Sequence, residues 1–326
     1  MPGWKDAIEQ FFKVAKNMDE KDMTELFKAD LYRMGALYLG MQIDSIYAQF
    51  PSFIAKGEKE QALKMRNKVE ELYDSMDDIL ASHKLDRLDV WLDWAKKWGN
   101  NESESNYYEN DAKRIVTTWM PGVEDYAART WHGLLREYYK PRMLKHIDSL
   151  IKDEMKDWTI IDDEKWHFKS VEKYSKEMSN PVAQTIKLVD EATKLRSSIQ
   201  EIDKNNTFAS FAFARNTHQT STVLPISQEG LMDSEKITFR VINTGKTDKK
   251  MKVKEVHLIG DGKVGMQKTF DKDNTLSKDS PFTFSVEKMA SNITANNESI
   301  IWVLLETETD EEAKLIMEVQ TELRGK

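Results

Sequence analysis

The sequence contains no cysteine. This absence excludes disulfide bonds, thiolate metal ligands and a cysteine nucleophile. No apolar run approaches the roughly 20 residues that a membrane-spanning helix needs, and no charged-then-apolar leader opens the chain, so we expect no membrane partner. Basic residues are also in deficit, because 48 Lys and Arg stand against 56 Asp and Glu for a net charge of -8. Such a field repels a phosphate backbone, so we expect no nucleic-acid partner.

Common catalytic and cofactor motifs are absent as well. The six histidines are scattered, and none stands four residues from another, as a helical zinc pair would. There is no glycine-rich phosphate loop or nucleophile elbow, and we predict no metal site and no cofactor. Two carboxylates held about 5 to 9.5 Å apart could cleave a glycosidic bond. With 56 acidic residues, however, the sequence alone cannot select such a pair.

The composition changes along the chain. Eight of the nine tryptophans precede residue 200, whereas Thr, Ser, Asn and alternating Val or Ile become dense after Asn205. A chain of 326 residues can form two ordinary cores. We therefore predict an all-helical domain over residues 1–204 and a second domain over residues 205–326.

Apolar residues in the first domain recur at intervals of three and four, which is the helical period. This period predicts an irregular bundle of mostly antiparallel helices, at residues 4–18, 23–50, 57–82, 86–98, 103–118, 124–157, 163–178 and 181–202. Because Pro141 removes a backbone donor, we expect a kink in the helix predicted at 124–157, with Tyr138 and Tyr139 on different faces.

The period becomes two after Asn205, which is typical of strands. Strands are predicted at Ile237–Val241, Val253–Leu258, Phe282–Val286, Ile300–Leu305 and Leu315–Val319. An antiparallel β-sandwich of roughly 120 residues would close them. The predicted fold class is therefore α then β, an irregular helical bundle followed by an antiparallel β-sandwich.

Two groups of tryptophans are candidates for different roles. Trp91, Trp94 and Trp98 share one helix face, and the pattern predicts an aromatic seam in the core. Trp119 directly precedes the helix-breaking Met120-Pro121-Gly122, so its ring should stand at a helix end beside a loop, with Tyr126 just beyond it. Rings at such ends are free to stack on a sugar face, and we expect at least one of them to be exposed.

The segment around Trp119 carries a long ordered motif. It reads Tyr108-Glu109, Thr117-Thr118-Trp119, Asp125-Tyr126-Ala127, Gly133-Leu134 and Tyr138-Tyr139-Lys140-Pro141-Arg142. This motif resembles the C-terminal helical domain of glycoside hydrolase family 89, the α-N-acetylglucosaminidases, and a weaker likeness extends from Trp4 through Trp166. The chain departs from the family pattern at Met120, Lys113, Ala128 and Thr130, and the segment after residue 205 has no counterpart in it.

The resemblance implies a function for the chain as part of a larger enzyme. In that family a (β/α) barrel carries both catalytic carboxylates and removes terminal α-linked N-acetylglucosamine with retention. We expect that barrel, in the same polypeptide or a separate chain, to be a partner, and we place no catalytic residue within these 326 residues. The positions that match the pocket-facing residues of the family are Trp119, Tyr126 and Val123. A secreted, periplasmic or cell-surface parent, with its leader outside this sequence, fits the resemblance.

Two rival functions remain open at this stage. The chain could be a free-standing glycan-binding protein, with Trp302 or Phe282 and Phe284 exposed on one flat face of the predicted sandwich. Inward alternation of those residues counts against it. The chain could also be a protein-interaction scaffold without any ligand.

Overall fold

The computed structural model of the chain describes residues 2–119, 124–152, 158–171 and 178–203, together with eight strands between residues 207 and 323. Side chains are placed for most of the helical residues and for a few strand positions. The chain divides into two compact units, Met1–Asp44 with Lys64–Ser197, and Ser45–Leu63 with Ser198–Lys326. The domain boundary predicted between residues 204 and 205 stays a prediction.

The described helices agree in most places with the periodicity of the sequence. Their bounds are α1 Pro2–Lys16, α2 Glu25–Tyr47, α3 Phe50–Ala55, α4 Lys59–Ala81, α5 Leu88–Lys96, α6 Glu102–Ile115, α7 Lys140–Lys152, α8 Ile160–His167 and α9 Pro181–Asp203. Two short 3₁₀ turns, η1 Glu20–Asp22 and η2 Lys84–Asp86, and one π-helical turn, η3 Leu135–Tyr139, complete them. Pro51 lies in the first turn of α3, where its missing donor costs no helical hydrogen bond.

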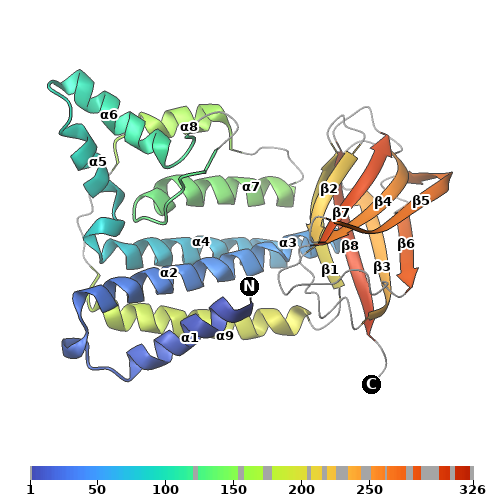
Figure 1. The fold of residues 1–326 in the computed structure, drawn as a ribbon, viewed down its shortest axis with the longest axis horizontal. Helices are drawn as coiled ribbons and strands as arrows, with labels where there is room; N and C mark the ends of the chain where they lie inside the picture. Colours follow the sequence, from blue (N-terminus) through green and yellow to red (C-terminus); the bar gives the residue numbers. More distant parts are fainter. Residues whose placement is uncertain are drawn as a thin grey trace. The chain divides into compact units, whose positions relative to one another are not determined.

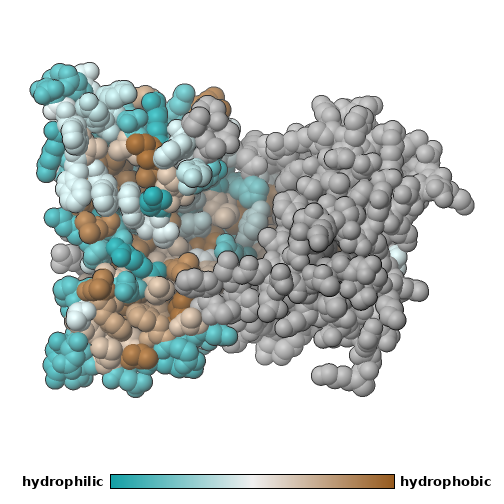
Figure 2. Space-filling model, viewed as in Figure 1, coloured by the Kyte–Doolittle hydropathy of each residue, from teal (hydrophilic) through white to brown (hydrophobic). Residues whose placement is uncertain are grey.

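Helices α2 and α4 run through the middle of the helical part, with α1 and α9 on one side and α7 and α8 on the other (Figure 1). Polar contacts between helices support this order. The hydroxyl of Tyr38 on α2 lies 3.0 Å from Glu9 of α1 and 3.1 Å from Thr193 of α9. On the opposite side, Arg66 of α4 donates to Asp148 of α7 at 3.0 Å. Figure 2 shows apolar residues toward the middle of this part and hydrophilic residues at its outer edge.

The segment predicted as one helix over residues 124–157 is not one helix. Residues 124–127 form a turn, residues 128–131 have no regular secondary structure, and helix begins at Leu134, directly before the π-helical turn. The carboxylate of Asp77, fully buried on α4, accepts the backbone N–H of Gly133 at 2.8 Å and of Arg136 at 3.1 Å. These bonds cap the helix at that point, and they come from a residue more than fifty positions away.

A π-helical turn stands just before the proline where a kink was predicted. The backbone N–H of Lys140 bonds to the carbonyl of Leu135, one residue further back than in an α-helix. Tyr138 and Tyr139 have different partners, because the Tyr138 hydroxyl donates to Asp163 at 2.6 Å whereas the Tyr139 hydroxyl lies 3.1 Å from the Val116 carbonyl. Residues 153–157, at the end of the predicted helix, lie outside the described residues.

The predicted core seam of Trp91, Trp94 and Trp98 is wrong. Trp94 is 42% exposed and Trp98 is 78% exposed. The buried residues of this helix are Leu88 and Leu92, which pack with Tyr138 and Trp166 in one apolar cluster. Trp91 and Trp94 do lie side by side, with ring centroids 5.0 Å apart, but the leucine face of α5 is the one that the bundle covers.

The strands of the second unit are described chiefly as backbone. Their bounds are β1 Thr207–Ala214, β2 Gln219–Leu224, β3 Ser234–Asn243, β4 Met251–Gly260, β5 Lys263–Leu276, β6 Phe282–Glu287, β7 Ile301–Glu308 and β8 Ala313–Leu323. Antiparallel pairing gives the strand orders β1-β8-β3-β6 and β2-β7-β4-β5. Most side chains of these strands, including Trp302 and Phe284, lie outside the described residues.

The predicted fold class is corrected at this point. Among the residues whose side chains the structure describes, most are helical, and no antiparallel β-sandwich is shown. Alternation of apolar residues predicts extended segments and their pairing. A sandwich also requires two sheets to bury their faces against each other, and no periodicity along a single strand determines that packing.

Candidate functional site

The candidate site is built around the rings of Trp119 and Tyr126, which we call the aromatic pair. Their centroids lie 5.6 Å apart at an interplanar angle of 57°. Trp119 is 44% exposed and Tyr126 is 76% exposed, which confirms the expectation that at least one ring is open to solvent. Val123 lies outside the described residues, so its predicted role in the site stays a prediction.

The backbone around the pair adopts an uncommon conformation. Trp119 has φ 50° and Asp125 has φ 62°, so both lie in the left-handed region that L residues seldom occupy. Hydrogen bonds hold this geometry, because the Trp119 N–H donates to the Arg114 carbonyl and the Asp125 N–H donates to the Thr117 carbonyl, both at 2.7 Å. Strained residues of this kind persist where their surroundings determine them, and they often occur at ligand sites.

Asp125 connects the aromatic pair to the helices behind it. One carboxylate oxygen lies 3.2 Å from the Tyr139 hydroxyl, and the other accepts from Arg142 at 2.5 Å. Burial raises the pKa of Tyr139 above its ordinary value, and the negative charge of Asp125 raises it further. Tyr139 therefore remains a neutral hydrogen-bonding group, while the hydrogen bonds of Asp125 anchor the residues that carry Tyr126.

A second polar network lies beneath the loop. His167 is buried, with its Nε2 2.8 Å from the hydroxyl of Thr117. Lys113 is 1% exposed and donates from Nζ to the carbonyls of His167 at 3.2 Å and Lys169 at 2.6 Å. Its Nζ also lies 3.1 Å from the Glu109 carboxylate, which compensates the buried charge.

Burial lowers the pKa of His167 to about 4. The nearby charges of Arg114 and Lys113 act in the same direction, and the charge of Asp163 opposes them. The ring is therefore neutral near pH 7. Because a neutral buried imidazole that hydrogen-bonds a threonine adds rigidity rather than acid or base chemistry, we interpret this network as support for the loop.

A cleft with a volume of about 580 Å³ opens beside residues 128–131, which follow the aromatic pair in the chain. Helix α2 contributes Arg33, Leu37 and Asp44 to its lining, α4 contributes Tyr73, and Trp131 and Tyr139 complete the aromatic part. Tyr139 also approaches Asp125, so the cleft and the aromatic pair are connected through these two residues. The aromatic residues of the cleft lie far apart in the sequence, and sequence reasoning assigned it no residue.

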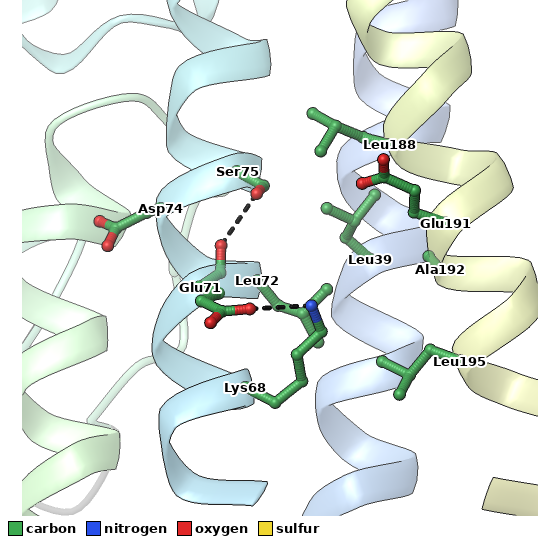
Figure 3. A pocket seen from close by; sticks show the side chains of 10 residues that line it. All are labelled: Leu39, Lys68, Glu71, Leu72, Asp74, Ser75, Leu188, Glu191, Ala192 and Leu195. Carbon is green, nitrogen blue, oxygen red and sulfur yellow. Dashed lines mark hydrogen bonds and ion pairs between the residues drawn. The ribbon is translucent and has the colours of Figure 1, made fainter. Parts of the chain in front are cut away.

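A smaller cavity with a volume of about 360 Å³ lies between α4 and α9, with α2 between them (Figure 3). Its lining combines apolar and polar side chains, Leu39, Leu72, Leu188, Leu195, Ala192, Lys68, Glu71, Asp74, Ser75 and Glu191. Lys68 and Glu71 at its rim bind each other at 2.8 Å. Since no aromatic ring lines this cavity, it lacks the groups that suit the aromatic pair to a ring ligand.

The part of the chain that the structure describes shows no metal-binding cluster and no membrane-spanning helix. Within that part, no three His, Asp or Glu side chains converge in a way that could hold a metal ion. No described helix has both the length and the apolar composition required to cross a bilayer. The chemistry available at the site is ring stacking combined with hydrogen bonding from hydroxyl, carboxylate and guanidinium groups.

Most of the helical part of the chain matches a known protein family. The family described as "Alpha-N-acetylglucosaminidase (NAGLU) C-terminal domain" matches residues 3–198. The human protein "Alpha-N-acetylglucosaminidase" is 32% identical over 83 residues, which are 25% of this chain and 11% of that protein. The chain therefore spans only a small part of the length of this relative.

A solved structure shows a similar fold. It is a variant of CpGH89 from Clostridium perfringens, in complex with its substrate GlcNAc-alpha-1,4-galactose. The similarity has a TM-score of 0.50 at 24% sequence identity, and it covers 58% of this chain and 23% of that one. At this identity the likeness concerns the fold alone.

Proposed function

Because the chain belongs to the family of alpha-N-acetylglucosaminidase C-terminal domains, we propose that it supports the catalytic barrel of a glycoside hydrolase and supplies one wall of its sugar pocket. In this proposal Trp119, Tyr126 and Val123 face the terminal α-linked N-acetylglucosamine. The barrel, in the same polypeptide or in a separate chain, contributes the two catalytic carboxylates. The chain itself performs no hydrolysis.

The observation that carries the proposal is the exposure of the aromatic pair. Buried aromatic side chains contact apolar neighbours on all sides, whereas pocket aromatics leave a face or an edge open. Trp119 and Tyr126 are 44% and 76% exposed, and their loop is held by Asp125 rather than by burial of the rings. Two open rings on a firmly anchored loop are suited to stacking against the C–H face of a sugar.

The polar groups around the pair support a binding role rather than a catalytic one. Asp125 is engaged by Arg142 and Tyr139, so its carboxylate is committed to holding the loop. A general acid for glycoside cleavage must present a proton to the leaving group, whereas both carboxylate oxygens of Asp125 accept hydrogen bonds from its neighbours. The proposal therefore assigns hydrolysis to residues outside this chain.

The first test measures hydrolysis directly. The purified 326-residue chain is expected to release no chromophore from an aryl α-N-acetylglucosaminide, because the proposal places both carboxylates in the barrel. Turnover that disappears after a carboxylate within this chain is changed would contradict the proposal.

The second test measures binding by saturation-transfer NMR, with N-acetylglucosamine and the disaccharide GlcNAc-alpha-1,4-galactose as probes. Trp119→Ala and Tyr126→Ala should each weaken contact with the N-acetylglucosamine ring by about 0.5 to 1.5 kcal/mol, the scale of a lost aromatic contact. Trp98→Ala is the matched control, because Trp98 is 78% exposed and lies just past the end of α5 rather than beside the aromatic pair. Equal transfer in all three variants, or none in the unmodified chain, would count against the aromatic pair as a sugar-facing wall.

A further inference from the structure

We propose that Lys113 and Thr117, near the end of α6, are positioning residues that fix the direction of Trp119 and thereby set how tightly the aromatic pair holds a sugar ring. This inference rests on the proposed function, because it concerns the same rings. Lys113 and Thr117 are 1% and 0% exposed, so neither of them touches a ligand. They act by fastening the end of α6 to the end of α8.

The ammonium group of Lys113 caps the C-terminal end of α8, which lies beside α6 (Figure 1). Helix α8 ends at His167, and the last carbonyls of a helix have no partner within it. Lys113 Nζ donates to the carbonyl of His167 at 3.2 Å and to that of Lys169, just beyond the helix, at 2.6 Å. A cation is also favourable at this negative end of the helix dipole. Because the donor comes from α6, capping α8 joins the two helices.

The ammonium group has an acceptor for each of its three N–H bonds. The third acceptor is the carboxylate of Glu109, 3.1 Å from Nζ, and the ring of Trp166 lies 5.8 Å from the same atom, within the range of a cation–π contact. Three oxygens around one buried nitrogen fix the register between the end of α6 and residues 167–169. The desolvation of a buried charge offsets much of its attraction, so the contribution of Lys113 lies more in this register than in net stability.

Thr117 connects this register to the turn that carries Tyr126. Its hydroxyl donates to the Lys113 carbonyl at 2.7 Å and lies 2.8 Å from Nε2 of His167. The Thr117 carbonyl in turn accepts the N–H of Asp125 at 2.7 Å, directly before Tyr126. One buried residue therefore contacts the end of α8, the end of α6 and the backbone that holds the second ring of the pair.

The direction of Trp119 depends on the same helix end. The carbonyl of Arg114 accepts the N–H of Thr117 at 3.1 Å and the N–H of Trp119 at 2.7 Å. Trp119 leaves the helix with φ 50°, a region that a bulky residue seldom occupies. Since its ring is 44% exposed, the backbone that carries the ring governs its direction. A shift at the end of α6 would therefore turn the indole.

The experiment measures the order of the Trp119 ring directly. The full 326-residue chain is labelled with ¹⁵N at tryptophan, and the indole signal of Trp119 is identified by its absence in Trp119→Phe. Lys113→Met and Thr117→Val should each lower the heteronuclear NOE of this indole N–H. They should also weaken binding of N-acetylglucosamine, followed by saturation-transfer titration, by about two- to tenfold, the scale of ordering one loosened side chain on binding.

The two substitutions remove the contacts with little other change. In Lys113→Met the carboxylate of Glu109 keeps Lys96 as a partner at 2.9 Å, so no carboxylate loses its only cation. Methionine also preserves the unbranched shape of the lysine side chain. Thr117→Val removes the hydroxyl and keeps the branched shape of the threonine.

Arg66→Met is the matched control. Like Lys113, Arg66 carries a largely buried charge that joins two helices, because its side chain is 20% exposed and pairs with Asp148 of α7 at 3.0 Å. Its partners lie outside the contacts around Lys113. The control should lower the thermal stability of the chain and leave the NOE of the Trp119 indole unchanged.

The outcomes separate this inference from the proposed function. An indole as ordered as in the unmodified chain, or an unchanged sugar affinity, in both Lys113→Met and Thr117→Val would overturn the positioning role even where Trp119→Ala abolishes binding. An equal loss of indole order in Arg66→Met would overturn it as well, since general destabilisation would then explain the effect. If both variants loosen the ring but the unmodified chain binds no sugar, the two residues still position Trp119 and the proposed function fails. If Lys113→Met does not fold, the result for Thr117→Val decides the question.

Discussion

The stability of the chain should depend on pH through His167. The Thr117 hydroxyl donates its only proton to the Lys113 carbonyl at 2.7 Å, so Nε2 of His167, 2.8 Å from the same hydroxyl, carries the proton of the neutral ring. Protonation would add a second N–H and a positive charge to His167, a residue that is only 2% exposed. Burial first, and then the charges of Arg114 and Lys113, therefore lower the pKa to about 4.

The size of the effect follows from the difference between the folded and unfolded pKa values. The unfolded ring titrates near pH 6.5, and the folded ring near pH 4. Because folding favours the neutral ring, the contribution to stability is complete above pH 6.5 and is lost as the pH falls toward 4. Proton linkage then gives a loss of about 1.4 kcal/mol at about pH 5.5 and about 2.5 kcal/mol at about pH 4.5.

The assay compares the unmodified chain with His167→Gln by urea unfolding near pH 7, 5.5 and 4.5. Glutamine keeps a donor for Thr117 but does not titrate. Between the two ends of this range the unmodified chain should lose about 2.5 kcal/mol more stability than the variant. Carboxylates with lowered pKa values, such as Glu109 and Asp162, titrate mostly below this window. Equal losses in the two proteins would refute the neutral, buried state of His167.

Three further predictions concern packing, the loop and the domain boundary. A Cβ at Gly35 would lie 2.6 Å from Thr185 Cγ2, whereas the nearest contact of a Cβ at Gly40 would be 3.4 Å. Gly35→Ala should therefore lower the free energy of unfolding by about 1 to 3 kcal/mol, and Gly40→Ala should raise it by up to about 1 kcal/mol. Thermal denaturation of the two variants can confirm or reverse this order. Asp125→Ala should accelerate amide exchange in the loop and cost about 1 to 3 kcal/mol, so unchanged exchange would contradict its role as anchor. A fragment of residues 1–204 should be soluble and helical by circular dichroism, because that length buries roughly 70% of its unfolded surface; precipitation would argue against an independent helical domain.

The helical bundle was predictable because local periodicity reports directly on helix formation. The helix predicted at residues 57–82 is α4, Lys59–Ala81, and the one predicted at 181–202 is α9, Pro181–Asp203. The start of the helix before Pro141 was not predictable in the same way. It depends on the buried carboxylate of Asp77, and no pattern within residues 124–140 shows that a distant side chain caps the helix there.

The tryptophans show how far periodicity reaches in locating a site. The helix-breaking residues after Trp119 correctly predicted an exposed ring beside a loop. For Trp94 and Trp98 the same kind of reasoning predicted burial and was wrong. A helical period shows which residues share a face, but the identity of the covered face depends on which neighbouring helix supplies complementary apolar surface.

The sequence by itself determined the absence of thiol chemistry, the helical character of the first two hundred residues, the position of the aromatic pair at a helix end and the family resemblance. These properties reside in composition, local period and a continuous motif. Only the tertiary structure decided that Asp125 anchors the loop, that His167 is neutral, and that Tyr73, Trp131 and Tyr139 line one cleft. Each of those features joins side chains from separate helices and loops, and their approach is set by how the helices pack rather than by any interval along the chain.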